Sequence, residues 1–259
     1  MKTDKTIKWS QEVENSLARF NQVDVRDEIV DVLENCRKRL PGKISPSITL
    51  VEQCDPQKLF GQNCLTYICM LLFRAISVIE GAIESLNNKN ILSMVLCIRA
   101  HYETTGAIGF FLSRLTDYYA KRILFKEVNQ VIYGLTTGSR DKYLCKAPEA
   151  KNILTLIDAA DKFLKREIIK NLSDEKKMLR ENYDFLSEFC HPNFHSHTLG
   201  AEFNVEEKTV RFLRKSKILE REFGLFGYLA ISGPIFLLFF DRIYNLIKTN
   251  ETMPKAMEE

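Results

Sequence analysis

Apolar residues recur along most of this chain with the period of about 3.6 residues that marks an amphipathic helix. The pattern is clearest over 62–83, where apolar side chains follow each other at spacings of three and four. The positions on this face are Leu65, Ile68, Cys69, Leu72, Ile76, Ile79 and Ile83. No Pro interrupts 57–147 or 149–191, so long helices can form there. The pattern therefore predicts a mainly α fold.

Breaking and capping residues predict where these helices begin and end. Asp24 and Ser173 are candidate N-caps, and Pro148 suits a first helical turn. Pro41-Gly42 ends one helix, and Asn87–Asn90 forms a turn that caps the next. The helices predicted in this way span 10–20, 24–39, 58–86, 91–114, 117–133, 148–166 and 173–190, with loops at 40–56 and 134–147.

Two segments depart from the amphipathic pattern. Residues 199–213 alternate with a period of two, which predicts a β-hairpin. Residues 223–240 carry no charge over 18 positions, a length at the lower edge of a membrane span. A helix that is apolar all round lies either at the centre of a bundle or in a bilayer. We favour the central helix, because the amphipathic helices need an apolar partner.

The predicted fold is therefore mainly α, a single bundle of about seven or eight helices with one small hairpin. Residues 1–56 form an N-terminal helical segment and loop that packs on the bundle. The bundle itself spans 57–249, and 250–259 form a flexible tail.

Composition limits the function less than it limits the fold. The chain has 37 basic and 34 acidic residues, a balance too even to indicate nucleic-acid binding by itself. Its seven Cys are scattered without a Cys-x-x-Cys pair, which favours reduced thiols and a cytoplasmic location. The first residues contain no apolar stretch, so we expect no secretory signal. The common nucleotide, hydrolase and metalloprotease motifs do not occur, and we expect no cofactor.

Three of the four His lie within seven residues, at His191, His195 and His197. Pro192 should end the preceding helix at His191, so the cluster occupies a helix end and the following loop. These side chains are then ordinary surface groups, metal ligands together with Glu188, or a general acid–base catalyst. The spacing matches no standard zinc signature, and the sequence leaves all three interpretations open.

Arg99 and Glu103 are a second candidate, because they place two charges on an otherwise apolar helix face. Their i, i+4 spacing allows an ion pair. Since burying such a pair is costly, it either fixes the register of the bundle or serves as an anion or phosphate site. Arg74 and Glu80 in the preceding helix could add to the site, but the helix faces that carry them do not clearly agree.

The helix after Ser173 carries a polar stripe at spacings of three and four residues. Its members are Glu181, Asp184, Glu188 and His191. Such a face is usually solvated. If it faces Arg99, it completes a polar centre between two helices, and its carboxylates could hold a divalent ion.

Three features in this order resemble uncharacterised bacterial all-helical families near the HEPN superfamily. They are Arg99 with Glu103, the Ile-Asp-Ala-Ala-Asp-Lys stretch at 157–162, and Leu-Ser-Glu-Phe-Cys-His-Pro-Asn at 186–193, followed by a hairpin and an apolar last helix. The resemblance covers about residues 60–245. The close Arg-to-His spacing of the family's catalytic signature is not met here by Arg99 or Arg180.

The resemblance implies a cytoplasmic, dimeric helical protein that binds RNA or cleaves it without metal, in stress response, toxin–antitoxin systems or antiviral defence. RNA and an antitoxin protein are the implied partners, and a membrane is not. In a ribonuclease His191 would be the acid–base catalyst, Arg99 the phosphate clamp that Glu103 orients, and Asn193 or Tyr102 a hydrogen-bond donor. Asp184, Glu188 and His195 complete the expected ligand-binding set. The alternative function is a non-catalytic helical adaptor or sensor, and membrane association through 223–240 is a weaker alternative.

Overall fold

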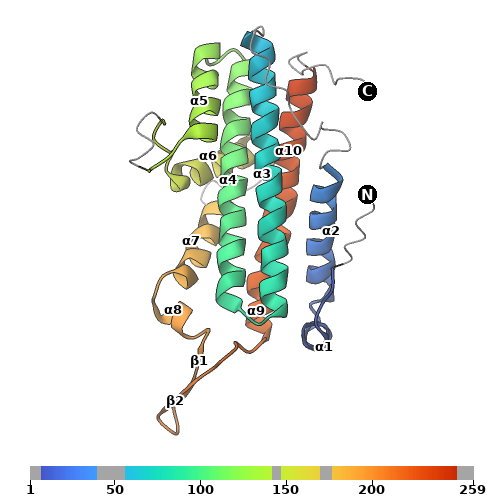
Figure 1. Ribbon diagram of the computed structural model, residues 1–259, viewed down its shortest axis with the longest axis vertical. Coiled ribbons are helices and arrows are strands. Elements are labelled where there is room, and N and C mark those ends of the chain that lie inside the picture. Colours follow the sequence, from blue (N-terminus) through green and yellow to red (C-terminus); the bar gives the residue numbers. More distant parts are fainter. Residues whose placement is uncertain (1–6, 40–55, 142–146, 170–176, 250–259) are drawn as a thin grey trace.

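The computed structural model describes residues 7–39, 56–141, 147–169 and 177–249. It confirms a mainly α bundle with one small antiparallel hairpin (Figure 1). The elements in chain order are α1 Gln11–Arg19, α2 Val23–Arg39, α3 Pro56–Asn87, α4 Ile91–Tyr119, α5 Phe125–Thr137, α6 Ile153–Glu167, α7 Met178–Cys190, α8 Phe194–His197, β1 Ala201–Asn204, β2 Thr209–Phe212, α9 Glu220–Phe226 and α10 Tyr228–Thr249.

The long helices α3 and α4 form an antiparallel hairpin through the predicted turn Asn87–Asn90 (Figure 1). Lys89 adopts a left-handed conformation with φ of 58°, which reverses the chain. The Asn90 side chain accepts a hydrogen bond of 3.2 Å from the Ser93 amide and so caps α4. Asn87 reaches back to the segment before α1, where its Oδ1 accepts from the Ser10 amide at 2.8 Å. The turn thus joins the central pair to the N-terminal segment.

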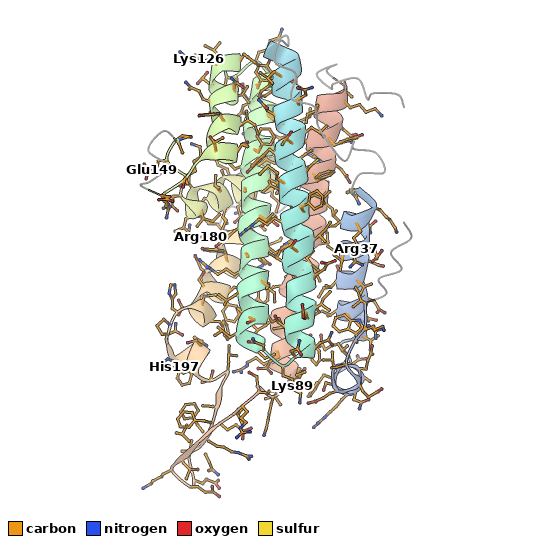
Figure 2. The ribbon with its side chains drawn as sticks, in the orientation of Figure 1. Arg37, Lys89, Lys126, Glu149, Arg180 and His197 are labelled. Atoms are coloured by element: carbon orange, nitrogen blue, oxygen red, sulfur yellow. The ribbon has the colours of Figure 1, made fainter. Side chains whose placement is uncertain are left out.

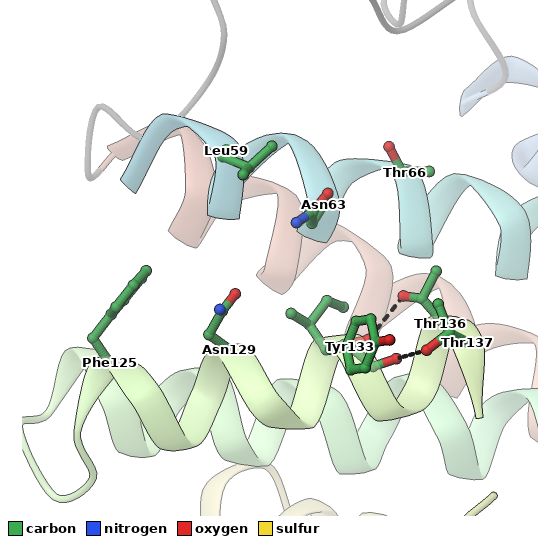
Figure 3. A pocket seen from close by; sticks show the side chains of 9 residues that line it. Leu59, Asn63, Thr66, Phe125, Asn129, Tyr133, Thr136 and Thr137 are labelled. Carbon is green, nitrogen blue, oxygen red and sulfur yellow. Dashed lines mark hydrogen bonds between the residues drawn. The ribbon is translucent and has the colours of Figure 1, made fainter. Parts of the chain in front are cut away.

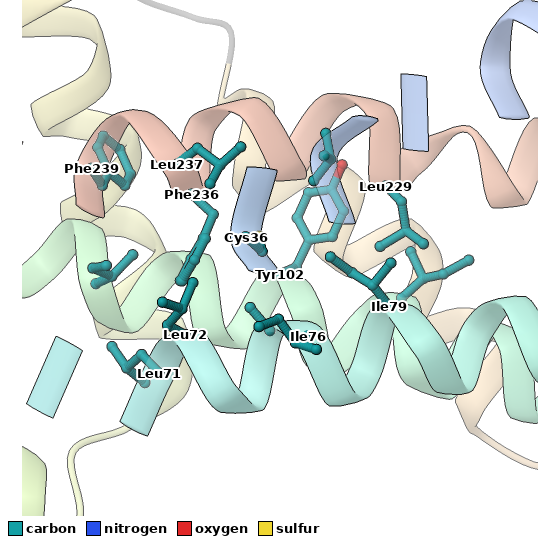
Figure 4. Close-up of a cluster of buried hydrophobic side chains, with 14 of the residues drawn as sticks. Cys36, Leu71, Leu72, Ile76, Ile79, Tyr102, Leu229, Phe236, Leu237 and Phe239 are labelled. Atoms are coloured by element: carbon teal, nitrogen blue, oxygen red, sulfur yellow. The ribbon is translucent and has the colours of Figure 1, made fainter. Parts of the chain in front are cut away.

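Helix α4 lies at the centre of the bundle and packs against α3, α5, α6, α7 and α10. Gly106 and Gly109 allow α6 and α10 to approach closely. A Cβ atom at Gly109 would lie 2.5 Å from the Ala160 Cβ and 2.6 Å from the Phe239 ring. Figure 4 shows Tyr102 of α4 within a cluster of buried side chains from α2, α3 and α10.

The uncharged segment 223–240 covers the end of α9 and the first part of α10, and α10 packs against α2, α3 and α4. Leu229, Phe236 and Phe239 are buried there. Two spans, Leu59–Asn87 and Glu220–Thr249, are long and apolar enough to cross a membrane, with 50% and 56% of their most apolar windows buried inside the bundle. Length and composition alone do not separate such core helices from membrane spans.

The N-terminal helix α2 packs along α10 and α3. Arg39 donates two hydrogen bonds, of 2.8 and 2.6 Å, to the carboxylate of Asp241 on α10. Arg37 forms an ion pair of 2.7 Å with Glu80 on α3. Part of the predicted loop 40–56 and the predicted tail 250–259 lie outside the described residues.

Several predicted boundaries were wrong. Pro148 does not lie in a helical turn, because α6 starts at Ile153 with Asn152 as its N-cap. Helix α4 continues through 115–119 and ends where Lys121 takes a left-handed conformation with φ of 58°. No breaker occurs before that point, so its hydrogen bonds continue. Asp24 lies in the first turn of α2 rather than at its cap.

The start of α7 also differs from the prediction. The helix begins at Met178, and the predicted cap Ser173 lies outside the described residues. Its first amides are satisfied from another helix, since the buried carboxylate of Asp161 on α6 accepts from Leu179 at 2.9 Å and Arg180 at 2.8 Å. A cap that comes from a distant position has no local sequence signal.

The close packing at Gly109 predicts that Gly109→Ala destabilises the protein by roughly 1–3 kcal/mol, because the added methyl must displace Ala160 and Phe239. Urea unfolding measures this loss. Gly134→Ala in α5 is the matched control, since a Cβ there meets nothing within 4 Å. That variant should gain about 0.5–1 kcal/mol from helix propensity. Equal effects of the two substitutions would contradict this account.

Candidate functional site

Arg99 on α4 makes polar contacts with two side chains of α7. Its Nε donates to the Ser187 Oγ at 3.0 Å, and its Nη2 donates to the Tyr183 hydroxyl at 2.5 Å. The guanidinium carbon also lies 4.9 Å from the centre of the Tyr183 ring, within cation–π range. The side chain is 28% exposed, so these contacts hold it in one orientation while solvent still reaches it.

Glu103 lies one turn further along α4 and contacts two arginines. Its Oε1 is 3.4 Å from Arg99 Nη2, and its Oε2 is 3.7 Å from Arg74 Nη2 on α3. Arg74 also donates from Nε to the Thr104 hydroxyl at 3.1 Å and is 51% exposed. Two guanidinium groups therefore share one carboxylate on an open face of the bundle. We call Arg74, Arg99 and Glu103, with Tyr183 and Ser187, the arginine site.

The environment of the arginine site keeps Arg99 charged. Partial burial by itself lowers the pKa of Arg99, but the Tyr183 hydroxyl and the Glu103 carboxylate outweigh that effect and leave the pKa above its ordinary value. Partial burial raises the pKa of the Cys190 thiol, and nearby Arg99 offsets only part of this shift. The site thus presents a fixed cation rather than a reactive thiolate.

The predicted stripe of α7 points away from Arg99. Asp184 forms an ion pair of 2.8 Å with Arg180, which also reaches Asp158 on α6 at 3.0 Å. Glu188 accepts a hydrogen bond of 3.0 Å from Asn193. The residues that face α4 are Tyr183 and Ser187, one position before Asp184 and Glu188. The orientation of α7 about its own axis follows from burial. Tyr183 is only 4% exposed and fixes which side of the helix packs inward.

The His-rich segment forms the end of α7 and the short helix α8. His191 is the exposed C-cap of α7, in an extended conformation with ψ of 150°. The Asn193 side chain accepts from the Ser196 amide at 3.3 Å and caps α8. Figure 2 shows Arg180 near the start of α7 and His197 toward the end of the bundle that carries the hairpin.

A metal centre in this segment finds no support in the ligand geometry. His195 lies against the Phe189 ring, with 5.3 Å between the ring centres, and both His191 and His197 are exposed. Within the described ranges, no three His, Cys, Asp or Glu side chains gather closely enough to hold a metal ion.

Tyr102 belongs to the core rather than to the arginine site. Its hydroxyl donates to the Tyr228 carbonyl at 3.1 Å and accepts from the Asn182 side chain at 3.1 Å. Burial raises the pKa of Tyr102. Since its ring is fully buried, it joins α4, α7 and the start of α10 behind Arg99.

Sequence reasoning identified Arg99 and Glu103 but not their partners on α7. Tyr183 and Ser187 are absent from the predicted site residues, and Ser187 carries no signal of its own. The spacing of the apolar residues Leu179, Tyr183 and Leu186 could have identified these partners, because it marks the side of α7 that packs inward. Ser187 directly follows Leu186 and borders that side.

A separate hollow of about 270 Å³ lies between α3 and α5 (Figure 3). Its lining combines apolar, hydroxyl and amide side chains without a charge: Leu59, Asn63, Thr66, Phe125, Asn129, Ile132, Tyr133, Thr136 and Thr137. It includes none of the site residues predicted from sequence. The hollow lacks the charged groups that an anion site needs.

Comparison with known proteins adds no assignment to this site. No family model matches the chain, and no curated protein or solved structure is significantly similar to it. The relationship to HEPN families stays a prediction from the sequence resemblance.

His101, the fourth His, is completely buried beside α10. Its Nδ1 lies 2.9 Å from the Ser232 hydroxyl, and its buried Nε2 has no hydrogen-bond partner in the described part of the chain. Burial lowers the pKa of His101 to about 3. The folded protein therefore holds this ring neutral at a pH where the unfolded chain binds a proton.

This burial predicts that stability falls as the pH drops below about 6.5, the pKa expected for an unfolded His. Between about pH 7.5 and 5.5, His101 should remove roughly 1.4 kcal/mol from the unfolding free energy. Urea unfolding at both pH values measures the loss. His101→Gln should abolish this contribution, whereas His195→Gln on the surface should retain it. An unchanged pH dependence in His101→Gln would contradict the prediction.

Proposed function

We propose that this protein binds RNA and that Arg99 and Arg74 together hold a phosphate of the RNA backbone. The observation that carries the proposal is the pair of guanidinium groups sharing Glu103, at 3.4 and 3.7 Å, on a face open to solvent. One carboxylate neutralises one of the two positive charges. The remaining charge attracts an anion, and phosphate is the group that arginine forks bind best in nucleic acids.

The rigidity of Arg99 supports this proposal. Tyr183 and Ser187 fix the guanidinium through Nη2 and Nε, so little side-chain freedom is lost when an anion binds. Arg74 is 51% exposed and can turn from Glu103 toward a ligand. Arg99 thus supplies a preorganised contact to the phosphate, and Arg74 supplies a contact that can adjust to it.

The proposal extends to cleavage by His191, in a cytoplasmic role in stress response or phage defence. His191 directly follows Cys190, whose thiol interacts with Arg99, so the exposed imidazole would turn toward the arginine site to reach a phosphate bound there. It would take the proton of the RNA 2′-hydroxyl as that oxygen bonds to phosphorus. It would then return the proton to the 5′-oxygen as the P–O5′ bond breaks, leaving a cyclic phosphate. Arg99 would stabilise the developing phosphorane charge.

A helical adaptor or sensor is the second candidate, and one specific observation favours it. Arg99 ties α4 to α7, and Arg74 ties α3 to α4, so the same contacts can serve only to fix the register of three helices. In that case the site needs no ligand. RNA binding by variants that stay folded separates the two functions.

Arg74→Ala tests the phosphate site, because this half-exposed side chain can be removed without opening the core. We expect roughly tenfold weaker binding to single-stranded RNA. The slope of the logarithm of the binding constant against the logarithm of the salt concentration should become shallower by about 0.7. Fluorescence anisotropy over a range of salt concentrations measures both.

Arg122→Ala is the matched control for this experiment. Arg122 is likewise 51% exposed and paired with a carboxylate, that of Asp117, but it lies near the junction of α4 and α5. The Arg122→Ala variant should bind RNA with the same affinity as the wild type. Equal losses in the two variants would indicate nonspecific attraction, and a wild type without RNA affinity would refute the proposal.

His191→Ala tests the cleavage step. The wild type should cleave a labelled RNA panel of transfer, single-stranded and double-stranded RNA in the presence of EDTA. The variant should retain binding and lose at least a hundredfold in rate, the usual range for removing a general acid–base group. His197→Ala should keep its activity. Cleavage by His191→Ala at the wild-type rate would rule out this role.

A further inference from the structure

The β1–β2 hairpin extends beyond the end of the helical bundle and exposes an apolar face (Figure 1). Phe203 lies opposite Val210, and Ala201 lies opposite Phe212. Directly opposed residues of an antiparallel pair share one face. Phe203, Val210 and Phe212 are 53%, 47% and 84% exposed, so this face is not covered by the bundle.

Such a hairpin needs a partner to be fully stable. An isolated two-stranded hairpin is marginal in water, and contiguous exposed apolar residues usually mark an interaction surface. The opposite face is polar, with Glu202 opposite Arg211 and Glu202 also in an ion pair with Lys217. The side that requires a partner is therefore the side of Phe203 and Phe212.

Charge is unevenly distributed along the hairpin. The turn carries Glu206, Glu207 and Lys208, a net charge of −1, and its shape is fixed by Asn204, whose Oδ1 accepts from the amides of both Glu residues at 3.1 Å. The chain leaving β2 carries Arg214 and Lys215. No ion pair engages Glu206, Glu207, Arg214 or Lys215 within the described residues.

We infer that the apolar face of the hairpin packs against the same face of a second copy of this chain, with the two hairpins antiparallel. A two-fold axis brings identical patches together, so Phe203, Val210 and Phe212 of each copy cover those of the other. The antiparallel arrangement places the acidic turn of each hairpin beside Arg214 and Lys215 of its partner. The patch is thus complementary to itself in both polarity and charge.

Charge favours a second copy over an anionic partner. A lipid surface or an RNA strand that covered the same face would meet the turn at the protruding end of the hairpin, whose net charge of −1 repels an anion. A second copy supplies two cationic side chains at that position.

The first test is the mass of the full chain without RNA, measured by sedimentation equilibrium over a concentration series. The wild type should dimerise, and Phe203→Ser with Phe212→Ser should raise the dimer dissociation constant at least tenfold, as expected when large apolar contacts are lost. Leu124→Ser is the control, because that side chain is 72% exposed but lies at the α4–α5 junction.

The second test exchanges the charges. One variant carries Glu206→Lys and Glu207→Lys, and the other carries Arg214→Glu and Lys215→Glu. Each variant alone juxtaposes like charges and should be mainly monomeric, whereas an equimolar mixture should form a heterodimer with both contacts restored.

A monomeric wild type, a dimer unaffected by the Phe substitutions, or a mixture that stays monomeric would overturn the inference. A monomer that binds anionic vesicles or single-stranded RNA through Phe203 and Phe212 would overturn it as well and identify the other occupant. Circular dichroism confirms folding of each variant, since every substituted side chain lies on the hairpin surface or at the exposed control position.

Discussion

The burial of α4 on almost its whole circumference is the constraint on which the rest of the structure depends. Gly106 and Gly109 remove the side chains that would hold α6 and α10 away, and a Cβ at Gly109 would clash with both neighbours. Helices in contact through small residues exclude water from a long seam and leave little freedom in their relative positions. Neighbouring helices are therefore placed by their fit to α4.

The narrow strip of α4 that remains open carries Arg99 and Glu103. The strip lies between α3 and α7, so Arg74 of α3 and the Tyr183 and Ser187 hydroxyls of α7 can reach it. The position of α7 depends in turn on Asp161, whose buried carboxylate accepts hydrogen bonds from the Leu179 and Arg180 amides in the first turn of that helix. Desolvation raises the pKa of Asp161, and the two backbone hydrogen bonds offset part of that shift. The packing of α6 and α7 in the core thus determines the geometry of the arginine site on the surface.

The arginine site and the hairpin are separate surfaces with different chemistry. The first is a charged patch held rigid by hydrogen bonds between helices, and the second is an apolar face that leaves the bundle. Our proposals assign RNA to the first and a second copy of the chain to the second. The two surfaces share no residue, so substitutions in one leave the side chains of the other in place.

Local sequence patterns were sufficient to predict the helical class, the Asn87–Asn90 turn, the hairpin and the i, i+4 pair of Arg99 and Glu103. Each of these depends on local periodicity or on side-chain bonds to nearby backbone. The contacts of Arg99 with Tyr183 and Ser187, in place of the polar stripe containing Asp184 and Glu188, could not be predicted in this way because they depend on long-range packing. Neighbouring residues of a helix point about 100° apart, so the facing side depends on how the whole helix is rotated. That rotation is set by the burial of Tyr183 and by the cap from Asp161, both of which need contacts far apart in the chain.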